Sequence, residues 1–352
     1  MSTGSEFARI RLQWTLYPNE GNKHLVYEAP SWTRLIWLLD VVFFVPIIIL
    51  VNYTLSQIYP VLAIPSRLTR STSAHSQKYI LTSSLRSIND LLRKHGGFMA
   101  NFRGFLFAFV HEGLSRIIAL FFKEPLGPYF SAIASLFASL VLVQFSTAWV
   151  HVIISRSQMS SLLFFRRLPP FSRTFEAIWK TVILSWAANE AARWLPNLLS
   201  SWLGIEWPEL RLFTPDNTYA FSQNLAWGGA VFYAKVVFVI IFSTFGSIFI
   251  VIPAKVALVR IQASLLPIEY DTIVPFDRSY HGKVKPIPMG GRGYATIADV
   301  WSTFTLDGWH SLTILSAKIA TVSLLVTFSI CLILTLEWTI LVTKSLELNQ
   351  PM

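Results

Sequence analysis

Long, predominantly apolar stretches contain ionisable side chains, and six of these are candidates for a binding site: His111, Glu112, Arg116, Glu190, Arg193 and Lys318. In a bilayer each such charge costs about 2.5–3.5 kcal/mol unless it meets water or a partner. Arginine and lysine bind carboxylates and phosphates well, so one interpretation is a cavity that attracts an anionic solute. The other is internal pairing, Glu112 with Arg116 and Glu190 with Arg193, which only neutralises buried charge. The residues alone support both interpretations.

Groups for covalent or metal chemistry are dispersed along the chain. The seven histidines are scattered, the single cysteine, Cys331, lies in an apolar run, and no nucleophile stands near a candidate base. One thiol can supply neither a disulfide framework nor a cysteine zinc site. We therefore expect no enzymatic activity, no cofactor, no metal and no nucleic-acid partner.

The composition indicates which elements must position these six side chains. The chain has 352 residues, of which 53% are hydrophobic and 14% charged, and its mean hydropathy is +0.51. Soluble domains carry about 25% charged residues, so we expect an integral membrane protein. A helix of about 20 apolar residues crosses the hydrocarbon. Six ranges fit that length: 32–59, 102–122, 130–154, 179–203, 230–258 and 309–342.

Positive charge is concentrated between the predicted spans. Three long connections, 60–104, 155–180 and 255–308, hold 18 of the 29 lysines and arginines. Basic loops stay on the side that is not translocated, so we expect these connections to share one face and both termini to share the other. The net charge of +10 favours contact between the basic loops and anionic lipid. Residues 1–31 contain no apolar run and are expected to form a soluble N-terminal segment.

A pattern with a period near 100 residues follows the predicted spans. Arginine and glutamine stand seven and nine residues after Trp149 and again after Pro253, at Arg156, Gln158, Arg260 and Gln262. The first unit offers Pro65, Arg67 and Arg70, then Gly97, Phe102, Arg103 and Gly104, and Asp307 and Gly308 open the last span. This resembles the mitochondrial carrier family. Its odd helices end in P-x-(D/E)-x-x-(K/R)-x-(R/K)-x-Q, and its even helices begin with (D/E)-G-x-x-x-x-(aromatic)-(K/R)-G.

The resemblance implies an all-α membrane protein with six transmembrane helices in three pseudo-repeats, 32–125, 126–228 and 229–345. It also implies a multi-pass protein of a mitochondrial membrane that transports a small, anionic solute by alternating access. The first substrate-contact position of the carriers falls on His111, seven residues after Gly104. The other charged residues of the spans are the remaining candidates for solute contact, and a protein partner stays open.

The chain departs from the carriers at the slots that pair one repeat with the next. The acidic slots hold Arg67, His151 and Lys255, and the basic slots hold Arg70, Ile154 and Leu258. Because no acid is present, we expect Arg67→Ala or Lys255→Ala to cost little stability. Such losses are typical of carrier-fold proteins that have abandoned exchange. The alternative function is therefore that of a non-transporting membrane adaptor, insertase or fusion component of the outer mitochondrial membrane.

Overall fold

The computed structural model describes residues 11–14, 25–28, 33–64, 84–126, 130–156, 169–205, 218–220, 230–267, 270–274, 276–280, 282–284 and 290–348. The chain forms two compact units, and long helices contribute residues to both. The first unit comprises Met1–Ile49, Asn197–Ile241 and Leu324–Met352. The second comprises Leu50–Pro196 and Phe242–Ser323.

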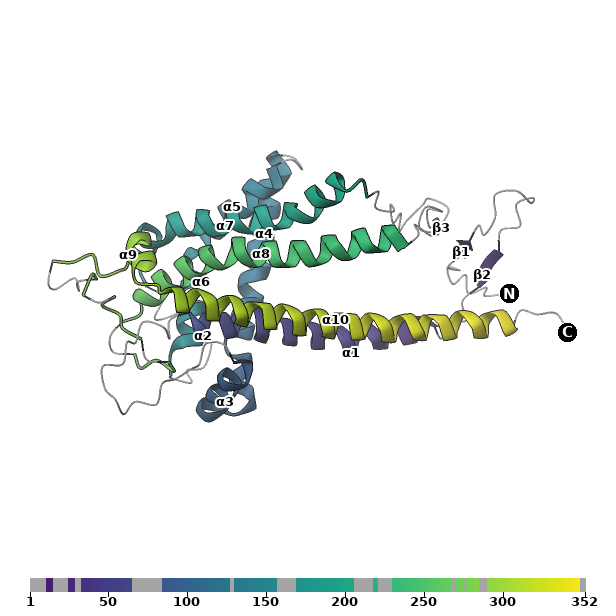
Figure 1. Ribbon diagram of the computed structural model, residues 1–352, viewed down its shortest axis with the longest axis horizontal. Helices are drawn as coiled ribbons and strands as arrows, with labels where there is room; N and C mark the ends of the chain where they lie inside the picture. Colours follow the sequence, from purple (N-terminus) through teal and green to yellow (C-terminus); the bar gives the residue numbers. More distant parts are fainter. Residues whose placement is uncertain are drawn as a thin grey trace, which may run out of the picture. The chain divides into compact units, whose positions relative to one another are not determined.

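The first unit also contains a small three-stranded sheet, although helices make up most of the fold. The strand β1 (Arg11–Trp14) pairs antiparallel with β2 (Leu25–Glu28) and parallel with β3 (Thr218–Ala220), in the order β2-β1-β3 (Figure 1). These strands come from segments that were expected to lack membrane helices. Segments such as Leu-Val-Tyr-Glu combine β-branched and aromatic residues, which favour strands. Runs of three or four residues are too short for a sequence pattern to establish them.

Within the residues that the structure describes, four helical segments are long and apolar enough to cross a membrane: Leu38–Ala63, Phe98–Phe122, Val231–Ser264 and Leu306–Glu337. The helices that supply most of them are α1 (Thr33–Tyr53), α4 (Phe105–Leu126), α8 (Ala230–Ser264) and α10 (Leu306–Leu348). They match the first, second, fifth and sixth predicted spans. Only 6 to 11% of the most apolar window of each segment is buried inside the protein, so lipid must cover the rest. The chain is therefore a helical protein embedded in a membrane.

The third and fourth predicted spans are helical but differ from simple spans. Helices α5 (Ser131–Val141) and α6 (Val143–Ile154) meet at a bend of 62°, so they form either one broken span or a re-entrant pair. Helix α7 (Phe171–Trp202) has 32 residues, yet among the described helices it does not qualify as a span, because its ionisable residues lower its hydropathy. The structure thus offers four spans, or five with the bent pair. The six-span, three-repeat organisation stays a prediction.

Shorter elements of the second unit connect the long helices: η1 (Thr54–Ile58, a π-helical turn), α2 (Tyr59–Ala63), α3 (Leu85–Gly96), η3 (Phe98–Phe102) and α9 (Ile297–Ser302). Helix α3 buries Ile88 and Leu92, four residues apart, and exposes Arg93 and Lys94, as an amphipathic helix does. Helix α9 begins with a capping box, in which Thr296 and Asp299 exchange hydrogen bonds between side chain and backbone. Both short helices lie within the long basic connections.

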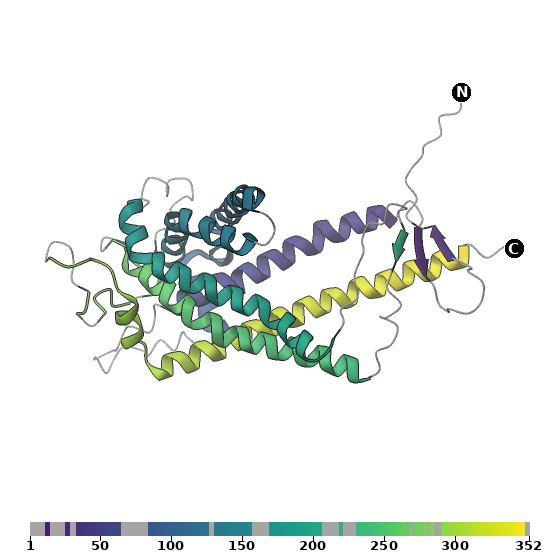
Figure 2. The same ribbon diagram turned by 90° about the horizontal axis from the view of Figure 1, so that it is seen from above.

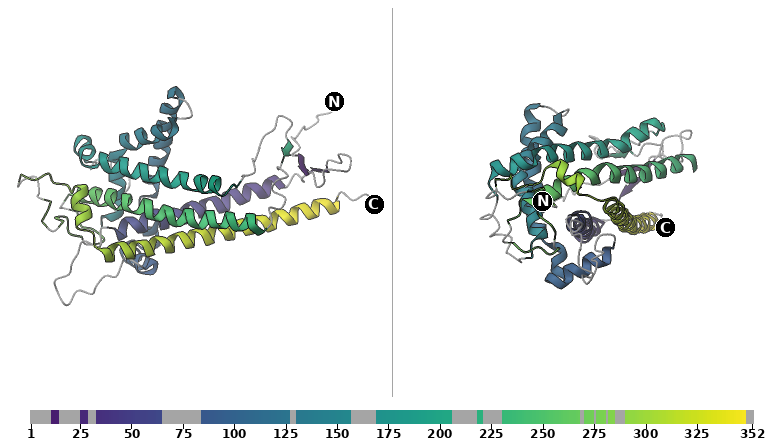
Figure 3. Two further views of the ribbon diagram at one scale, coloured as in Figure 1. Left: turned by 45° about the horizontal axis from the view of Figure 1, so that its top comes forward. Right: turned by 60° about the vertical axis from the view of Figure 1, so that its left-hand side comes forward.

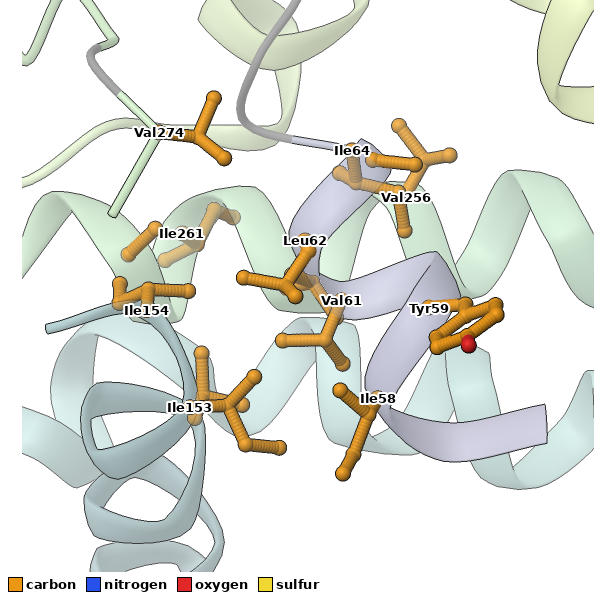
Figure 4. Packing of buried hydrophobic residues seen from close by; sticks show 14 of the residues in the cluster. Ile58, Tyr59, Val61, Leu62, Ile64, Ile153, Ile154, Val256, Ile261 and Val274 are labelled. Atoms are coloured by element: carbon orange, nitrogen blue, oxygen red, sulfur yellow. The ribbon is translucent and has the colours of Figure 1, made fainter. Parts of the chain in front are cut away.

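The core of the second unit lies where α2, α6 and α8 meet. Figure 4 shows Val61 and Leu62 of α2 facing Ile153 of α6 and Ile261 of α8, and all four side chains are at most 1% exposed. Burying an aliphatic side chain of this size contributes about 1.5–3 kcal/mol. The second-unit parts of α8 and α10 run in opposite directions beside α2 (Figures 2 and 3). This packing holds the helical segments α1–α2, α8 and α10, which enclose the candidate site.

Candidate functional site

A cavity of about 320 Å³ lies in the second unit, between α1–α2, α8 and α10. Its volume is at the lower end of the range of roughly 300–1,000 Å³ that is typical of small-molecule sites. All three enclosing segments belong to candidate membrane spans. The cavity is therefore built from membrane helices rather than from loops.

One stripe of each helix lines the cavity. On α1–α2 the lining residues are four apart, at Asn52, Ser56, Pro60 and Ile64, which is the spacing of one helical face. The walls are mostly aliphatic, and the polar members are Asn52, Ser56, Ser247, Lys255, Ser316 and Ser323. Among the described lining residues, Lys255 alone is charged. The cavity thus combines apolar walls, neutral hydrogen-bonding groups and one ammonium group.

The ammonium group of Lys255 is held against the backbone of the π-helical turn. Its Nζ donates a hydrogen bond to Ser56 O at 2.8 Å and lies 3.5 Å from Gln57 Oε1. Pro60 has no N–H with which to satisfy the carbonyl four residues earlier, and that carbonyl belongs to Ser56. Lys255 supplies this carbonyl with a donor from another helix. A lysine ammonium has three N–H donors, so this contact leaves donor capacity for a ligand.

This contact corrects the expectation that Lys255 stands unsatisfied in an empty acidic slot. Its partner is a main-chain oxygen on another helix, and no carboxylate within the described residues forms an ion pair with it. The sequence contained one signal at this position, because Pro60 has no N–H to offer the carbonyl of Ser56, four residues earlier. It did not indicate which side chain would contact that carbonyl. Arg67, Arg70 and Gln158, which belong to the same repeat pattern, lie outside the described residues.

Hydroxyl groups supply further polar contacts on the cavity wall. Ser323 Oγ is enclosed by protein and has no hydrogen-bond partner within the described structure. Ser247 Oγ donates its hydrogen to Ser243 O at 2.6 Å. Toward the cavity it can therefore act only as a hydrogen-bond acceptor. An enclosed hydroxyl without a partner is unusual in folded proteins and requires an explanation.

The six charged residues singled out in the sequence do not line this cavity as far as the structure describes it. Arg116 Nε donates to Glu112 Oε1 at 2.8 Å, with 76% and 61% of the two side chains exposed. Arg193 likewise pairs with Glu190 one turn away on α7. His111 is half-buried on α4, and Lys318 is exposed on α10. The structure therefore shows the local pairing and does not bring the six together.

Other basic side chains of the second unit also bind main-chain oxygens. Arg103 donates to Ser155 O at 2.7 Å, and His151 Nε2 lies 2.8 Å from Gln262 O. A carbonyl oxygen only accepts, so Nε2 of His151 carries the hydrogen in this contact. Each of these bonds joins residues more than 50 positions apart in the chain. The motif residues Arg103, His151 and Gln262 thus connect segments of the second unit that are far apart in the chain.

Arg260 is the most deeply enclosed cation of this group, at 1% exposure. It donates to Val300 O at 2.8 Å and to Thr303 Oγ1 at 3.1 Å. Its guanidinium carbon lies 5.2 Å from the ring centroid of Tyr280 and 5.1 Å from that of Phe304, within the range of cation–π attraction. The Tyr280 hydroxyl donates to Arg260 O at 2.5 Å, and burial raises the pKa of Tyr280.

The site is suited to binding rather than to covalent chemistry. One ammonium and several neutral hydrogen-bonding groups face an apolar cavity, and the described residues contain no group of side chains that could hold a metal ion. Comparisons with models of protein families, with curated proteins and with solved structures find no match to the chain. The resemblance to the mitochondrial carriers therefore rests on the residues quoted for it and stays a prediction.

Proposed function

We propose that the chain transports a small, anionic solute across its membrane, and that the solute binds in the cavity beside Lys255. One observation carries the proposal. A cavity between three membrane helices contains a single ammonium, and no acid among the described residues neutralises it. An anion placed there completes the charge balance, which lowers the cost of holding a lysine between membrane helices.

The mechanism that fits this arrangement is alternating access. The Lys255 contact joins α8 to the π-helical turn between α1 and α2, so an anion that draws the ammonium away also weakens a bond between two helices. A ligand shifts such an equilibrium only through different affinities for its two states. The resemblance to the mitochondrial carriers supports the same cycle, six spans and a mitochondrial membrane as parts of the proposal.

The test is uptake of labelled butyrate, succinate and phosphate by vesicles reconstituted with the full chain, relative to protein-free vesicles. We expect Lys255→Gln to reduce uptake of the transported anion at least tenfold, and Lys255→Arg to retain part of it. Lys318→Gln is the matched control, because this lysine lies on α10 outside the cavity lining. The opposite result, loss with Lys318→Gln alone, would move the site to the charged residues first singled out in the sequence.

A second candidate is a membrane adaptor, insertase or fusion component that does not transport. The bonds from Arg103, Lys255 and Arg260 to main-chain oxygens favour it, because they fasten helices together without the exchangeable ion pairs of a carrier. A folded wild-type chain that moves none of the three anions, and whose melting temperature none of them raises, would make this the leading function.

A further inference from the structure

We propose that the solute is a small monocarboxylate that carries an uncharged hydrogen-bonding group, such as a hydroxy acid. This inference rests on the proposed function and specifies its substrate class. It comes from three properties of the cavity: its charge, the order of its polar groups along the helices, and its size.

The charge of the cavity selects one negative charge. The described lining contains one cation, Lys255, and no carboxylate. A second anionic group on the solute would meet only neutral donors such as Asn52 and the serines, between apolar walls. An ionised group buried without a counter-charge is strongly disfavoured. Dicarboxylates and phosphate esters of higher charge should therefore bind less well than a monocarboxylate.

The polar groups extend from Lys255 toward one end of the cavity. Asn52 precedes Ser56, whose carbonyl holds the lysine, by four residues, or about 6 Å at 1.5 Å per residue. A helical side chain leans toward the N-terminus of its helix, so Lys255 reaches toward Ser247. Because α10 runs opposite to α8 (Figure 2), Ser323 lies toward the same end as Ser247. Asn52 thus lies about one helical turn from the carbonyl that holds Lys255, and Ser247 and Ser323 lie toward the same end of the cavity.

Ser323 is the part of this arrangement that points most directly to a ligand. Its hydroxyl is enclosed and unpartnered among the described residues, and it lines the cavity. A hydroxyl or keto oxygen of the solute would supply the missing hydrogen bond. The opposite end, formed by Pro60, Ile64 and Leu312, offers only apolar contact. The cavity volume of about 320 Å³ is in the range of small-molecule sites.

The experiment compares three acids of four carbons, namely 3-hydroxybutyrate, butyrate and succinate, with the full-length protein. Uptake into vesicles is measured above that of protein-free vesicles, and the melting temperature is measured in detergent with each acid. We expect 3-hydroxybutyrate to exceed butyrate, and butyrate to exceed succinate, with at least a tenfold difference in uptake between the first and the last. The melting temperature should rise in the same order.

Two variants locate the contacts. Lys255→Gln should remove the preference for monocarboxylates over succinate. Ser323→Ala should bring the ratio of 3-hydroxybutyrate to butyrate uptake close to one, whereas Ser329→Ala, at an exposed serine of the same helix whose hydroxyl bonds Leu325 O, should leave that ratio as it is in the wild type. An unchanged ratio in Ser323→Ala would overturn the contact to the hydroxyl group.

The outcomes separate this inference from the function on which it rests. Uptake of succinate or phosphate that equals or exceeds that of 3-hydroxybutyrate, and that depends on Lys255, would overturn the substrate class and leave transport standing. A folded protein that neither moves nor is stabilised by any of these anions would overturn both.

Discussion

Two groups of charged side chains in the second unit follow different rules. Lys255 and Arg260 on α8 are held by main-chain oxygens of other elements, Ser56 O and Val300 O. By contrast, two ion pairs form within single helices, one turn apart: Glu112–Arg116 on α4 and Glu190–Arg193 on α7. Three of these four side chains are more than 60% exposed. The first group stabilises contacts between different elements. The second group forms ion pairs on the surface of a single helix.

The difference has an energetic consequence. A buried carbonyl that loses its donor costs about 1–3 kcal/mol, and hydrogen bonds from charged groups contribute about 1.5–3 kcal/mol. Exposed pairs at a spacing of three or four residues contribute about 0.3–0.5 kcal/mol. Substitutions in the first group should therefore change stability severalfold more than substitutions in the second.

The largest effect is expected at Arg260. Arg260→Met removes two hydrogen bonds and the stacking on Tyr280 and Phe304, and should lower the free energy of unfolding by about 3 kcal/mol or more. Arg260→Lys keeps the charge but loses the planar group, so it should recover only part of this. Denaturant unfolding in detergent micelles measures both. A loss below 1 kcal/mol in Arg260→Met would show that these contacts do not stabilise the fold.

A smaller effect is expected at Lys255, where the sequence predicted almost none. Lys255→Met leaves Ser56 O without its lysine donor and should cost about 1–3 kcal/mol. Pro60→Ala adds an N–H four residues after that carbonyl, at the spacing of an α-helical hydrogen bond. The cost of Lys255→Met should therefore shrink when Pro60→Ala is already present, which a double-mutant cycle in the same unfolding assay detects. Additive losses would disprove the link between the proline and the lysine.

These two positions show what the sequence could and could not predict. Apolar runs predicted the four main spans closely; the range 230–258, for example, corresponds to α8, Ala230–Ser264. Hydropathy carried no sign of the 62° bend at Leu142 between α5 and α6. Local spacing offered the Glu112–Arg116 pair as one of two interpretations, and the structure contains that pair. Local spacing could not identify the partners of Lys255 and Arg260, because a main-chain oxygen far along the chain leaves no side-chain pattern.

A pH-dependent effect of about 1 kcal/mol is expected at Tyr280, whose hydroxyl donates to Arg260 O in a bond of ordinary net strength. Burial raises its pKa in the folded state, whereas in the unfolded chain it is about 10. Folding therefore favours the neutral hydroxyl. Its contribution to the free energy of unfolding is complete below pH 10 and declines as the pH rises above 10. The advantage of wild type over Tyr280→Phe, measured by unfolding from pH 7 to 11, should shrink above pH 10. A constant difference would show that the hydroxyl does not titrate with folding.

The smallest effect is expected for the pair on α7, and it decides whether this helix is the fourth span. If α7 lies in water or at the membrane surface, Glu190→Gln should change the free energy of unfolding by only about 0.3–0.5 kcal/mol, and added salt should remove the difference. If α7 crosses the bilayer there, the variant leaves Arg193 without its counter-charge in hydrocarbon, at a cost of about 2.5–3.5 kcal/mol that salt does not screen. Because α7 does not qualify as a span among the described helices, we expect the small, salt-sensitive result.

The measurement is unfolding in lipid bicelles at low and high salt, with Arg193→Gln as the matched variant. A large loss of stability that salt does not change would show that α7 crosses the bilayer, as the fourth predicted span requires.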